Sequence, residues 1–187
     1  AAAARRAADL GVTVDGVRVD FTAVMRHVRA AMTAIAPDDS PQALTRDGVQ
    51  VVAGTAKFTG PMSADVDGRL VRFRQAVVAT GSAPTLPRVP GLAGAGPLTT
   101  DTVWALGELP ARLVILGGGA VGCELGQAFA RLGSSVTLVE AQPRILLRED
   151  PIAARLVAAA LEHDGVTVRA GDTVATVGPD AVTLVGG

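Results

Sequence analysis

The stretch Arg112-Leu-Val-Ile-Leu-Gly-Gly-Gly-Ala-Val-Gly-Cys-Glu-Leu-Gly126 decides the fold of this chain. It opens with an apolar run typical of a buried strand and closes with the periodicity of an amphipathic helix. Gly117, Gly119 and Gly122 stand at G-x-G-x-x-G spacing between and within these two elements. This order predicts a βαβ unit whose glycine loop faces the pyrophosphate of a dinucleotide.

Each glycine of the motif has a separate physical task. Gly117 permits the tight turn from strand to helix, Gly119 lets the backbone approach the pyrophosphate, and Gly122 lets the helix pack close to the strand. Free N–H groups and the positive end of the helix dipole then face the phosphates. The other residues predicted to bind the dinucleotide in this loop are Gly118, Ala120 and Val121.

A second strand supplies the acidic residue that such a unit requires. Ser135-Val-Thr-Leu-Val-Glu140 is a strand-like run whose last residue lies 23 positions after Gly117. There a carboxylate accepts hydrogen bonds from the adenosine ribose hydroxyls. A carboxylate at Glu140 would repel the 2′-phosphate of NADP(H), which favours NAD(H). Arg144 and Arg148 would relieve that repulsion if they turned inward, so NADP(H) stays open.

The pattern around this unit alternates between strands and helices. We expect strands over 112–116 and 135–140, helices over 120–132 and 151–164, and short strands near 166–169 and 173–177. The alternation predicts an α/β fold with a Rossmann-like, doubly wound parallel sheet.

The first half of the chain has a different pattern. A helix is expected over 21–35, with Asp20 as its cap, and a short helix opens at Ser40 and Pro41. Strand-like runs then occur at 49–52, 56–58, 69–73 and 76–79, with a turn at 65–68, which together predict an antiparallel β-meander. A connector rich in glycine and proline follows over 81–100.

Composition excludes several classes of function. The 187 residues carry a net charge of −1, which gives no general attraction for nucleic acid. The chain holds a single cysteine, Cys123, and two widely separated histidines, His27 and His163, so we expect no disulfide, no redox cysteine pair and no metal site. We expect no membrane span and no signal peptide, hence a cytoplasmic protein.

Several motifs together resemble one flavoprotein family. They are Gly54-Thr-Ala-Lys-Phe58, Val77-Val-Ala-Thr-Gly-Ser-Ala-Pro84, the glycine stretch over 117–126, and Pro143-Arg-Ile-Leu146. In this order and spacing they resemble the pyridine nucleotide-disulfide oxidoreductases, the family of dihydrolipoamide dehydrogenase, glutathione reductase and mercuric reductase. The resemblance covers the whole chain. Ala36–Ser40 and Arg148–Pro151 look most like the mercuric reductase branch.

The resemblance implies a division into two cofactor lobes. In this family the FAD domain is interrupted by the NAD domain. Residues 1–106 would therefore be the C-terminal part of the FAD-binding lobe and residues 107–187 an incomplete NAD(P)-binding Rossmann-like lobe, with the chain truncated at both ends. The residues implied to lie against FAD are Ala56, Ala79, Thr80 and Gly81.

The resemblance also implies roles for three residues of the NAD lobe. Glu124 would meet the nicotinamide carboxamide, Ala120 would lie where a side chain gates the flavin face, and Val174 would touch the adenine. From position alone, Glu124 is equally well explained as a surface charge that favours the helix dipole. Cys123, in the same turn, is best explained as a small packing residue.

The function implied is part of an FAD-dependent NAD(P)H:disulfide or mercuric reductase-like oxidoreductase. The full-length enzyme would be a homodimer that passes hydride between nicotinamide and FAD and acts on a small-molecule or disulfide substrate. We expect no catalytic residue within these 187 positions and no activity of the fragment alone, because the redox cysteines are absent. Two alternatives stay open: a non-enzymatic NAD-sensing module, and a fragment of a ferredoxin reductase-like flavoprotein without a redox disulfide.

Overall fold

The computed structural model describes residues 2–5 and 7–186. The chain divides into two compact units, one formed by Ala1–His27 with Pro84–Gly187 and the other by Val28–Ala83. The predicted boundary between residues 106 and 107 is a different kind of division, because it is drawn between two cofactor-binding lobes and not between compact units. It stays a prediction.

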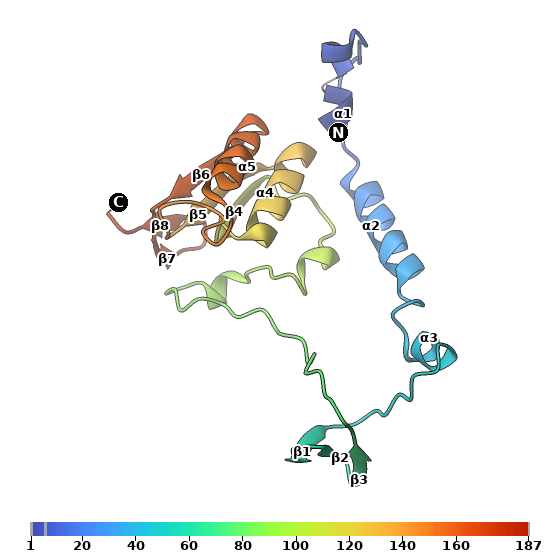
Figure 1. Cartoon of the computed structure of the whole chain (residues 1–187). Coiled ribbons are helices and arrows are strands. Elements are labelled where there is room, and N and C mark those ends of the chain that lie inside the picture. Colours follow the sequence, from blue (N-terminus) through green and yellow to red (C-terminus); the bar gives the residue numbers. More distant parts are fainter. Residues whose placement is uncertain (1, 6, 187) are drawn as a thin grey trace. The chain divides into compact units, whose positions relative to one another are not determined.

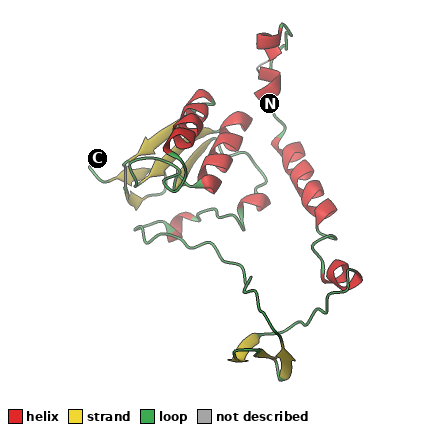
Figure 2. Ribbon diagram, viewed as in Figure 1, coloured by secondary structure: helices red, strands yellow, loops and turns green. Residues whose placement is uncertain are grey.

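A three-stranded parallel sheet is the centre of the first unit (Figures 1 and 2). Its strands are β4 (Arg112–Leu116), β5 (Ser135–Glu140) and β6 (Val166–Ala170), hydrogen-bonded in that order. Helices α4 (Ala120–Leu132) and α5 (Pro151–His163) connect them and lie side by side over the sheet. The predicted α/β alternation is confirmed, with β4, α4 and β5 at the predicted boundaries. The doubly wound arrangement stays a prediction.

Local sequence explains where the two helices begin and end. Pro151 occupies the first turn of α5, and the Asp150 carboxylate accepts hydrogen bonds from the N–H groups of Ile152 and Ala153. Helix α4 ends at Gly133, whose φ of 121° lies in a region that side chains rarely adopt. These signals fix the lengths of the helices and therefore the place where each strand returns to the sheet.

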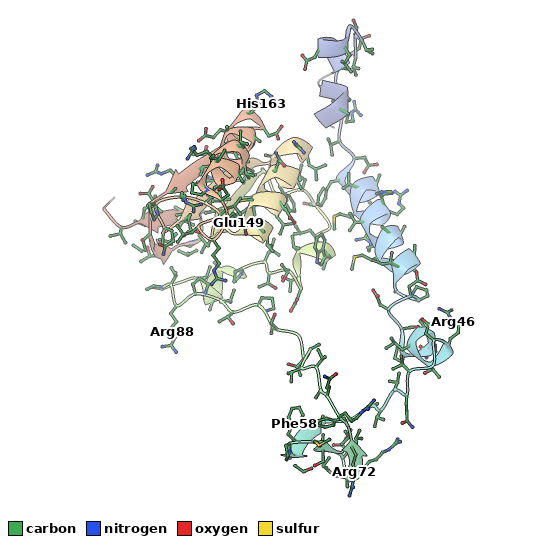
Figure 3. The ribbon with its side chains drawn as sticks, viewed as in Figure 1. Arg46, Phe58, Arg72, Arg88, Glu149 and His163 are labelled. Carbon is green, nitrogen blue, oxygen red and sulfur yellow. The ribbon has the colours of Figure 1, made fainter. Side chains whose placement is uncertain are left out.

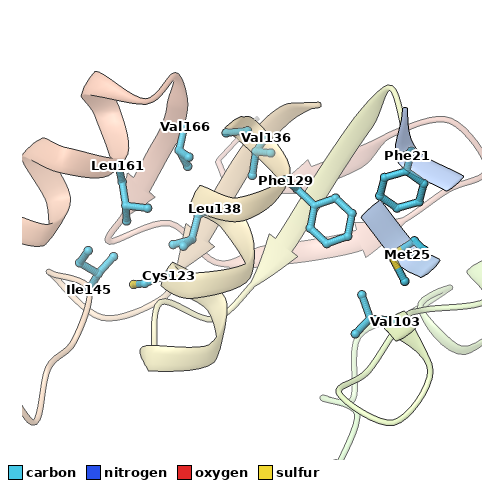
Figure 4. Close-up of a cluster of buried hydrophobic side chains, with 11 residues drawn as sticks. Phe21, Met25, Val103, Cys123, Phe129, Val136, Leu138, Ile145, Leu161 and Val166 are labelled. Carbon is cyan, nitrogen blue, oxygen red and sulfur yellow. The ribbon is translucent and has the colours of Figure 1, made fainter. Parts of the chain in front are cut away.

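The core of this unit is mostly aliphatic, with two phenylalanine rings, and lies between the helices and the sheet (Figure 4). Val136 and Leu138 of β5 and Leu161 of α5 are essentially inaccessible to solvent. The first turns of helix α2 (Phe21–Ile35) contribute to this core, because the ring centroid of Phe21 lies 6.3 Å from that of Phe129. The helix predicted over 21–35 is confirmed, and Asp20 caps it by accepting a hydrogen bond from the N–H of Ala23.

A short antiparallel pair and the connector complete the unit. Strands β7 (Val174–Val177) and β8 (Val182–Leu184) pair with each other, and the N–H of Val177 donates to the Pro90 carbonyl at 2.9 Å. The remaining elements here are short: α1 (Ala2–Arg5), η1 (Ala7–Leu10), η2 (Ala93–Ala95) and η3 (Val103–Ala105).

The second unit consists of the end of α2, a short helix and a β-meander. Helix α3 (Pro41–Arg46) is capped by Ser40 as predicted, and the sheet contains β1 (Ala56–Gly60), β2 (Ser63–Val66) and β3 (Arg69–Arg72). All pairs are antiparallel. Two residues in the left-handed region, Asp67 and Gly68, form the turn between β2 and β3. The predicted meander is therefore confirmed.

Three details of the predicted meander are wrong. Residues 49–52 and 76–79 form no strand, and β2 is a strand that the pattern did not reveal. A strand requires a neighbour for its N–H and C=O groups. In the described part of the chain neither run has one, and the side chains of Val77 and Val78 are 92% and 68% exposed.

Among the described residues, no helix is long and apolar enough to cross a membrane.

Candidate dinucleotide-binding site

The glycine loop between β4 and α4 is shaped by two glycines that the chain cannot replace cheaply. Gly117 has a φ of 108°, and its N–H donates to the Val139 carbonyl at 2.8 Å, which extends the pairing of β4 with β5. A Cβ at Gly122 would collide with the Gly117 carbonyl oxygen. Both steric tasks predicted from the sequence, the tight turn and the close packing, are confirmed.

Gly119 is the N-cap of α4 and has no side chain with which to cap it. It is exposed, and a Cβ built on it would meet no atom within 4 Å. The N–H of Cys123 donates to its carbonyl, and the N–H groups of the residues before Cys123 belong to the first turn, where a helix offers no internal acceptor. The open face of Gly119 thus lies beside backbone donors and the positive end of the helix dipole.

Glu140 ends β5 beside this loop and is held in place by backbone amides. Its Oε2 accepts a hydrogen bond from the N–H of Gly118 at 2.7 Å, and its Oε1 accepts one from the N–H of Gln142 at 2.8 Å. Because each carboxylate oxygen has two lone pairs, each retains one acceptor position. The carboxylate is therefore oriented and still able to accept further hydrogen bonds.

Gly118 is also closely surrounded by other parts of the chain. It is buried, and a Cβ there would lie 2.7 Å from Cγ2 of Ile145 and 3.1 Å from Cβ of Glu140. Its carbonyl accepts a hydrogen bond from the N–H of Leu146 at 2.8 Å. Both polar groups of Gly118 are thus bonded by Glu140 at the end of β5 and by the segment that follows it.

The segment 141–150, which we call the Arg144 loop, is folded around one guanidinium group. Nη1 of Arg144 donates to the Leu146 carbonyl at 2.6 Å and to the Ile145 carbonyl at 3.4 Å. Nη2 donates to the carbonyls of Leu147 and Glu149, at 2.8 and 3.1 Å. The guanidinium group of arginine has five N–H donors and can therefore bind several carbonyls at once.

The other residues predicted to bind the dinucleotide lie at two places. Ala120, Val121 and Glu124 are exposed in the first turns of α4. Val174 is half-buried at the start of β7, three residues after Gly171, whose N–H donates to the Glu140 carbonyl at 2.9 Å. The structure therefore brings the glycine loop and Glu140 together and places the turn before β7 against Glu140.

The residues implied to lie against FAD belong to the second unit. Ala56 begins β1 opposite Val66, whereas Ala79, Thr80 and Gly81 follow β3 in a segment without regular secondary structure. All four are exposed, and Gly81 has a φ of 73°. Their exposure is compatible with a place against a cofactor, and their contact with FAD stays a prediction.

Cys123 is a packing residue. It is buried, and its Sγ lies 3.6 Å from the Gly118 carbonyl oxygen. Burial, followed by the charges of Glu124 and Glu140, raises the pKa of the Cys123 thiol above its ordinary value. A raised pKa keeps the thiol protonated, so the interpretation of Cys123 as a packing residue is supported.

No group of three potential metal ligands occurs within residues 2–5 and 7–186. His163 lies at the last turn of α5 with an exposed side chain (Figure 3).

Sequence reasoning missed the contribution of the Arg144 loop. Ile145, which is 2% exposed, packs against Gly118, and Leu146, with a φ of 50°, donates its N–H to the Gly118 carbonyl. Both residues are distant from Gly118 in the sequence. The middle glycine of Gly117-Gly118-Gly119 is the one signal that would have pointed to such a close approach. A glycine outside the G-x-G-x-x-G pattern needs its own steric reason.

Comparison with known proteins gives the family. Residues 4–186 match the family described as pyridine nucleotide-disulphide oxidoreductase. This chain belongs to the pyridine nucleotide-disulphide oxidoreductases. The resemblance inferred from the motifs is thereby confirmed.

Individual members of the family show the same relationship. The chain is 36% identical over 178 residues to mercuric reductase of Streptomyces lividans, covering 90% of this chain and 37% of that protein. It is 37% identical over 147 residues to dihydrolipoyl dehydrogenase of Bacillus subtilis, covering 76% and 32%. Both names occur among the relatives, so the mercuric reductase branch stays a prediction.

A solved flavoprotein has a similar structure. It is the Cu(II) complex of HOCl-induced flavoprotein disulfide reductase RclA from Escherichia coli, at a TM-score of 0.70 and 25% identity. The match covers 89% of this chain and 41% of that one. The chain thus spans between 32% and 41% of the length of these three proteins.

Proposed function

We propose that this chain supplies the NAD(H)-binding arm of an FAD-dependent oxidoreductase. The observation that carries the proposal is the geometry around Gly118 and Gly119. An open glycine begins α4, and the carboxylate of Glu140 is fixed beside it by the 2.7 Å bond to the N–H of Gly118. Membership in the pyridine nucleotide-disulphide oxidoreductases supports the same assignment.

The pyrophosphate would bind at the N-terminus of α4. Gly119, Ala120 and Val121 are exposed residues there, and a Cβ built on Gly119 would meet no atom within 4 Å, so phosphate oxygens could approach its backbone. N–H groups of the first turn donate to phosphate, and the helix dipole favours its negative charge. Glu124, exposed further along the same helix, is proposed to meet the nicotinamide carboxamide, and Ala120 to lie at the flavin-facing position.

The adenosine half would bind at the end of β5. The Glu140 carboxylate keeps one acceptor position on each oxygen, which suits the two hydroxyls of a ribose. Val174 is proposed to contact the adenine.

NAD(H) is favoured over NADP(H) by the charges at this position. Two backbone hydrogen bonds hold the Glu140 carboxylate. If the ribose binds to this carboxylate as proposed, a 2′-phosphate would come close to it. The guanidinium of Arg144, one of the two arginines that would relieve that repulsion, donates to carbonyls of its own loop. Like charges in contact cost a few kcal/mol. We therefore expect NADPH to bind at least about tenfold more weakly than NADH, which corresponds to about 1.4 kcal/mol.

The resemblance assigns Ala56, Ala79, Thr80 and Gly81 to the FAD side, and the exposure of all four residues supports that role. FAD, when bound, takes up a hydride with its two electrons from the dihydronicotinamide, or returns it. The residues of this chain position the nicotinamide and the flavin. A homodimeric whole enzyme, located in the cytoplasm and acting on a disulfide, mercuric ion or other small molecule, belongs to the same proposal.

The chain by itself is proposed to be inactive toward disulfides. It has one cysteine, Cys123, and that thiol is buried with a raised pKa. Purified chain should show no flavin absorbance bands and no NADH oxidation. Stoichiometric flavin together with NADH turnover would contradict this part of the proposal.

Titration of the chain with NADH tests the proposed site. Replacing Glu140 by alanine removes the ribose acceptor and the anchor of Gly118, so the dissociation constant should rise at least about tenfold. Glu162→Ala, which removes an exposed carboxylate from α5, is the matched control and should leave the dissociation constant unchanged. The proposal fails if the unaltered chain does not bind NADH or prefers NADPH.

A further inference from the structure

The Arg144 loop contains a strained residue that the guanidinium group holds in place. Leu146 has a φ of 50°, a left-handed conformation that costs a residue with a Cβ roughly 1–2 kcal/mol. It is flanked by carbonyls that Arg144 binds: the Leu146 carbonyl at 2.6 Å and the Leu147 carbonyl at 2.8 Å. A charged donor on successive carbonyls opposes relaxation of this backbone.

The conformation of Leu146 has a direct consequence for the glycine loop. Its N–H donates to the Gly118 carbonyl at 2.8 Å, while the neighbouring side chain of Ile145 is buried against the Cα of Gly118. Glu140 binds the N–H on the other side of the same residue. Gly118 is thus held by its N–H, its carbonyl and its Cα, immediately before the N-cap Gly119.

We propose that Arg144 is a positioning residue for dinucleotide binding. Arg144 holds Leu146 in the left-handed conformation, Leu146 fixes the Gly118 carbonyl, and Gly118 fixes the backbone of Gly119 and the first N–H groups of α4. The proposal rests on the proposed function, because these N–H groups are the ones assigned to the pyrophosphate. Preorganised donors bind better because no free energy is spent on ordering them during binding.

This role differs from that of a 2′-phosphate ligand in what it predicts for the two nucleotides. NADH and NADPH carry the same pyrophosphate. Loss of a positioning residue therefore weakens both by the same factor, whereas loss of a 2′-phosphate ligand weakens NADPH alone. The ratio of the two dissociation constants separates these roles.

The experiment measures the dissociation constants of NADH and NADPH by fluorescence titration of the 187-residue chain. Arg144→Ala should raise both about tenfold, the effect of losing about 1.4 kcal/mol of binding free energy. Arg144→Lys keeps the charge but has no planar fork, so it should give an intermediate loss. Arg155→Ala, which removes an exposed arginine from α5, is the matched control and should change neither constant.

A second substitution tests the route through Leu146. Glycine adopts the left-handed conformation at little cost, so Leu146→Gly in the Arg144→Ala background should recover about threefold of the lost NADH affinity. Lower stability alone would not produce this recovery, since a leucine-to-glycine change removes packing. The double variant therefore distinguishes positioning from a general effect on folding.

The outcomes separate the two proposals. If the unaltered chain binds NADH and Arg144→Ala binds it equally well, the role of Arg144 is wrong and the proposed function stands. A loss confined to NADPH overturns the positioning role in favour of a 2′-phosphate contact. No NADH binding by the unaltered chain overturns both. If the alanine variant does not fold, Arg144→Lys decides: unchanged affinity contradicts the positioning role.

Discussion

The parallel sheet unit and the β-meander bury their aromatic residues very differently. Phe129 of α4 is 6% exposed and packs against Phe21 (Figure 4). Phe58 of β1 is 63% exposed (Figure 3), and its ring meets that of Phe73 edge-on, with the ring centroids 5.9 Å apart. In residues 28–83, all of which are described, Ala43 alone is buried. The strands of both sheets pair in a defined register, but a hydrophobic core covers the parallel sheet and not the meander.

The difference shows that pairing and burial are specified separately. In a βαβ unit the connecting helix returns over the sheet, so the same short sequence supplies both the ladder and its cover. In a meander the turns fix the register, but nothing in the three strands covers a face. The glycine loop and Glu140 therefore lie in a unit whose own core holds them in place.

The largest effect expected from this difference is at Phe129. Phe129→Ala removes a buried ring and leaves a cavity where that ring packs against Phe21, which costs about 3–5 kcal/mol in the free energy of unfolding. Urea denaturation followed by circular dichroism measures the loss. A loss below about 1 kcal/mol would mean that this core does not stabilise the unit.

Gly122→Val should have the next largest effect. Its side chain would force the start of α4 away from the Gly117 carbonyl, at a cost of about 3 kcal/mol in the free energy of unfolding. Gly119→Ala is the matched control, because a Cβ there enters open space. The control should unfold like the unaltered chain and still bind NADH more weakly. Equal stability of both variants would contradict the close packing of helix and strand.

Asp164 gives a smaller, pH-dependent effect on the same unit. The hydrogen bond from Arg131, at 2.9 Å, lowers the pKa of Asp164 below its ordinary value of 3.8, and Gln127 adds a second hydrogen bond. The ionised carboxylate therefore stabilises the fold at pH values above the ordinary pKa of 3.8. This contribution to the free energy of unfolding is lost as the pH falls through the lowered pKa. Asp164→Asn should cost about 1–3 kcal/mol at about pH 7. The difference from the unaltered chain should narrow below pH 3.8. A difference independent of pH would contradict this assignment.

The smallest effect is expected in the meander. Phe58→Ala removes an exposed ring and one edge-on aromatic contact, so the free energy of unfolding should change by about 1 kcal/mol or less. The comparison with Phe129→Ala is made under the same denaturation conditions. A loss as large as that of Phe129→Ala would show that Phe58 is covered in solution.

The elements that sequence predicted best are those whose signals are local. The strand before Gly117, the helix up to Leu132 and the strand ending at Glu140 follow from apolar periodicity and glycine placement within a few residues. Runs such as 49–52 carry the same β propensity but have no partner strand among the described residues, and propensity alone cannot supply one.

Within the site, sequence located the glycine loop and its acidic partner but missed how the two are fixed. The bond from Gly118 to Glu140 and the contact of Ile145 with Gly118 depend on where β5 delivers the following loop. Arg144 appeared in the sequence as a possible phosphate neighbour, whereas its donors are directed to backbone carbonyls. No spacing rule encodes that choice, because it depends on the path of the loop itself.

The most direct test of the central claim is the site of NADH binding in solution. An NMR titration of the isotopically labelled chain with NADH should perturb the backbone amides of residues 117–122 and 140–146 saturably, and leave those of residues 54–81 unchanged. Perturbations confined to residues 54–81, or an absence of saturable changes in the glycine loop, would contradict the assignment of this loop and Glu140 as the NAD(H) site.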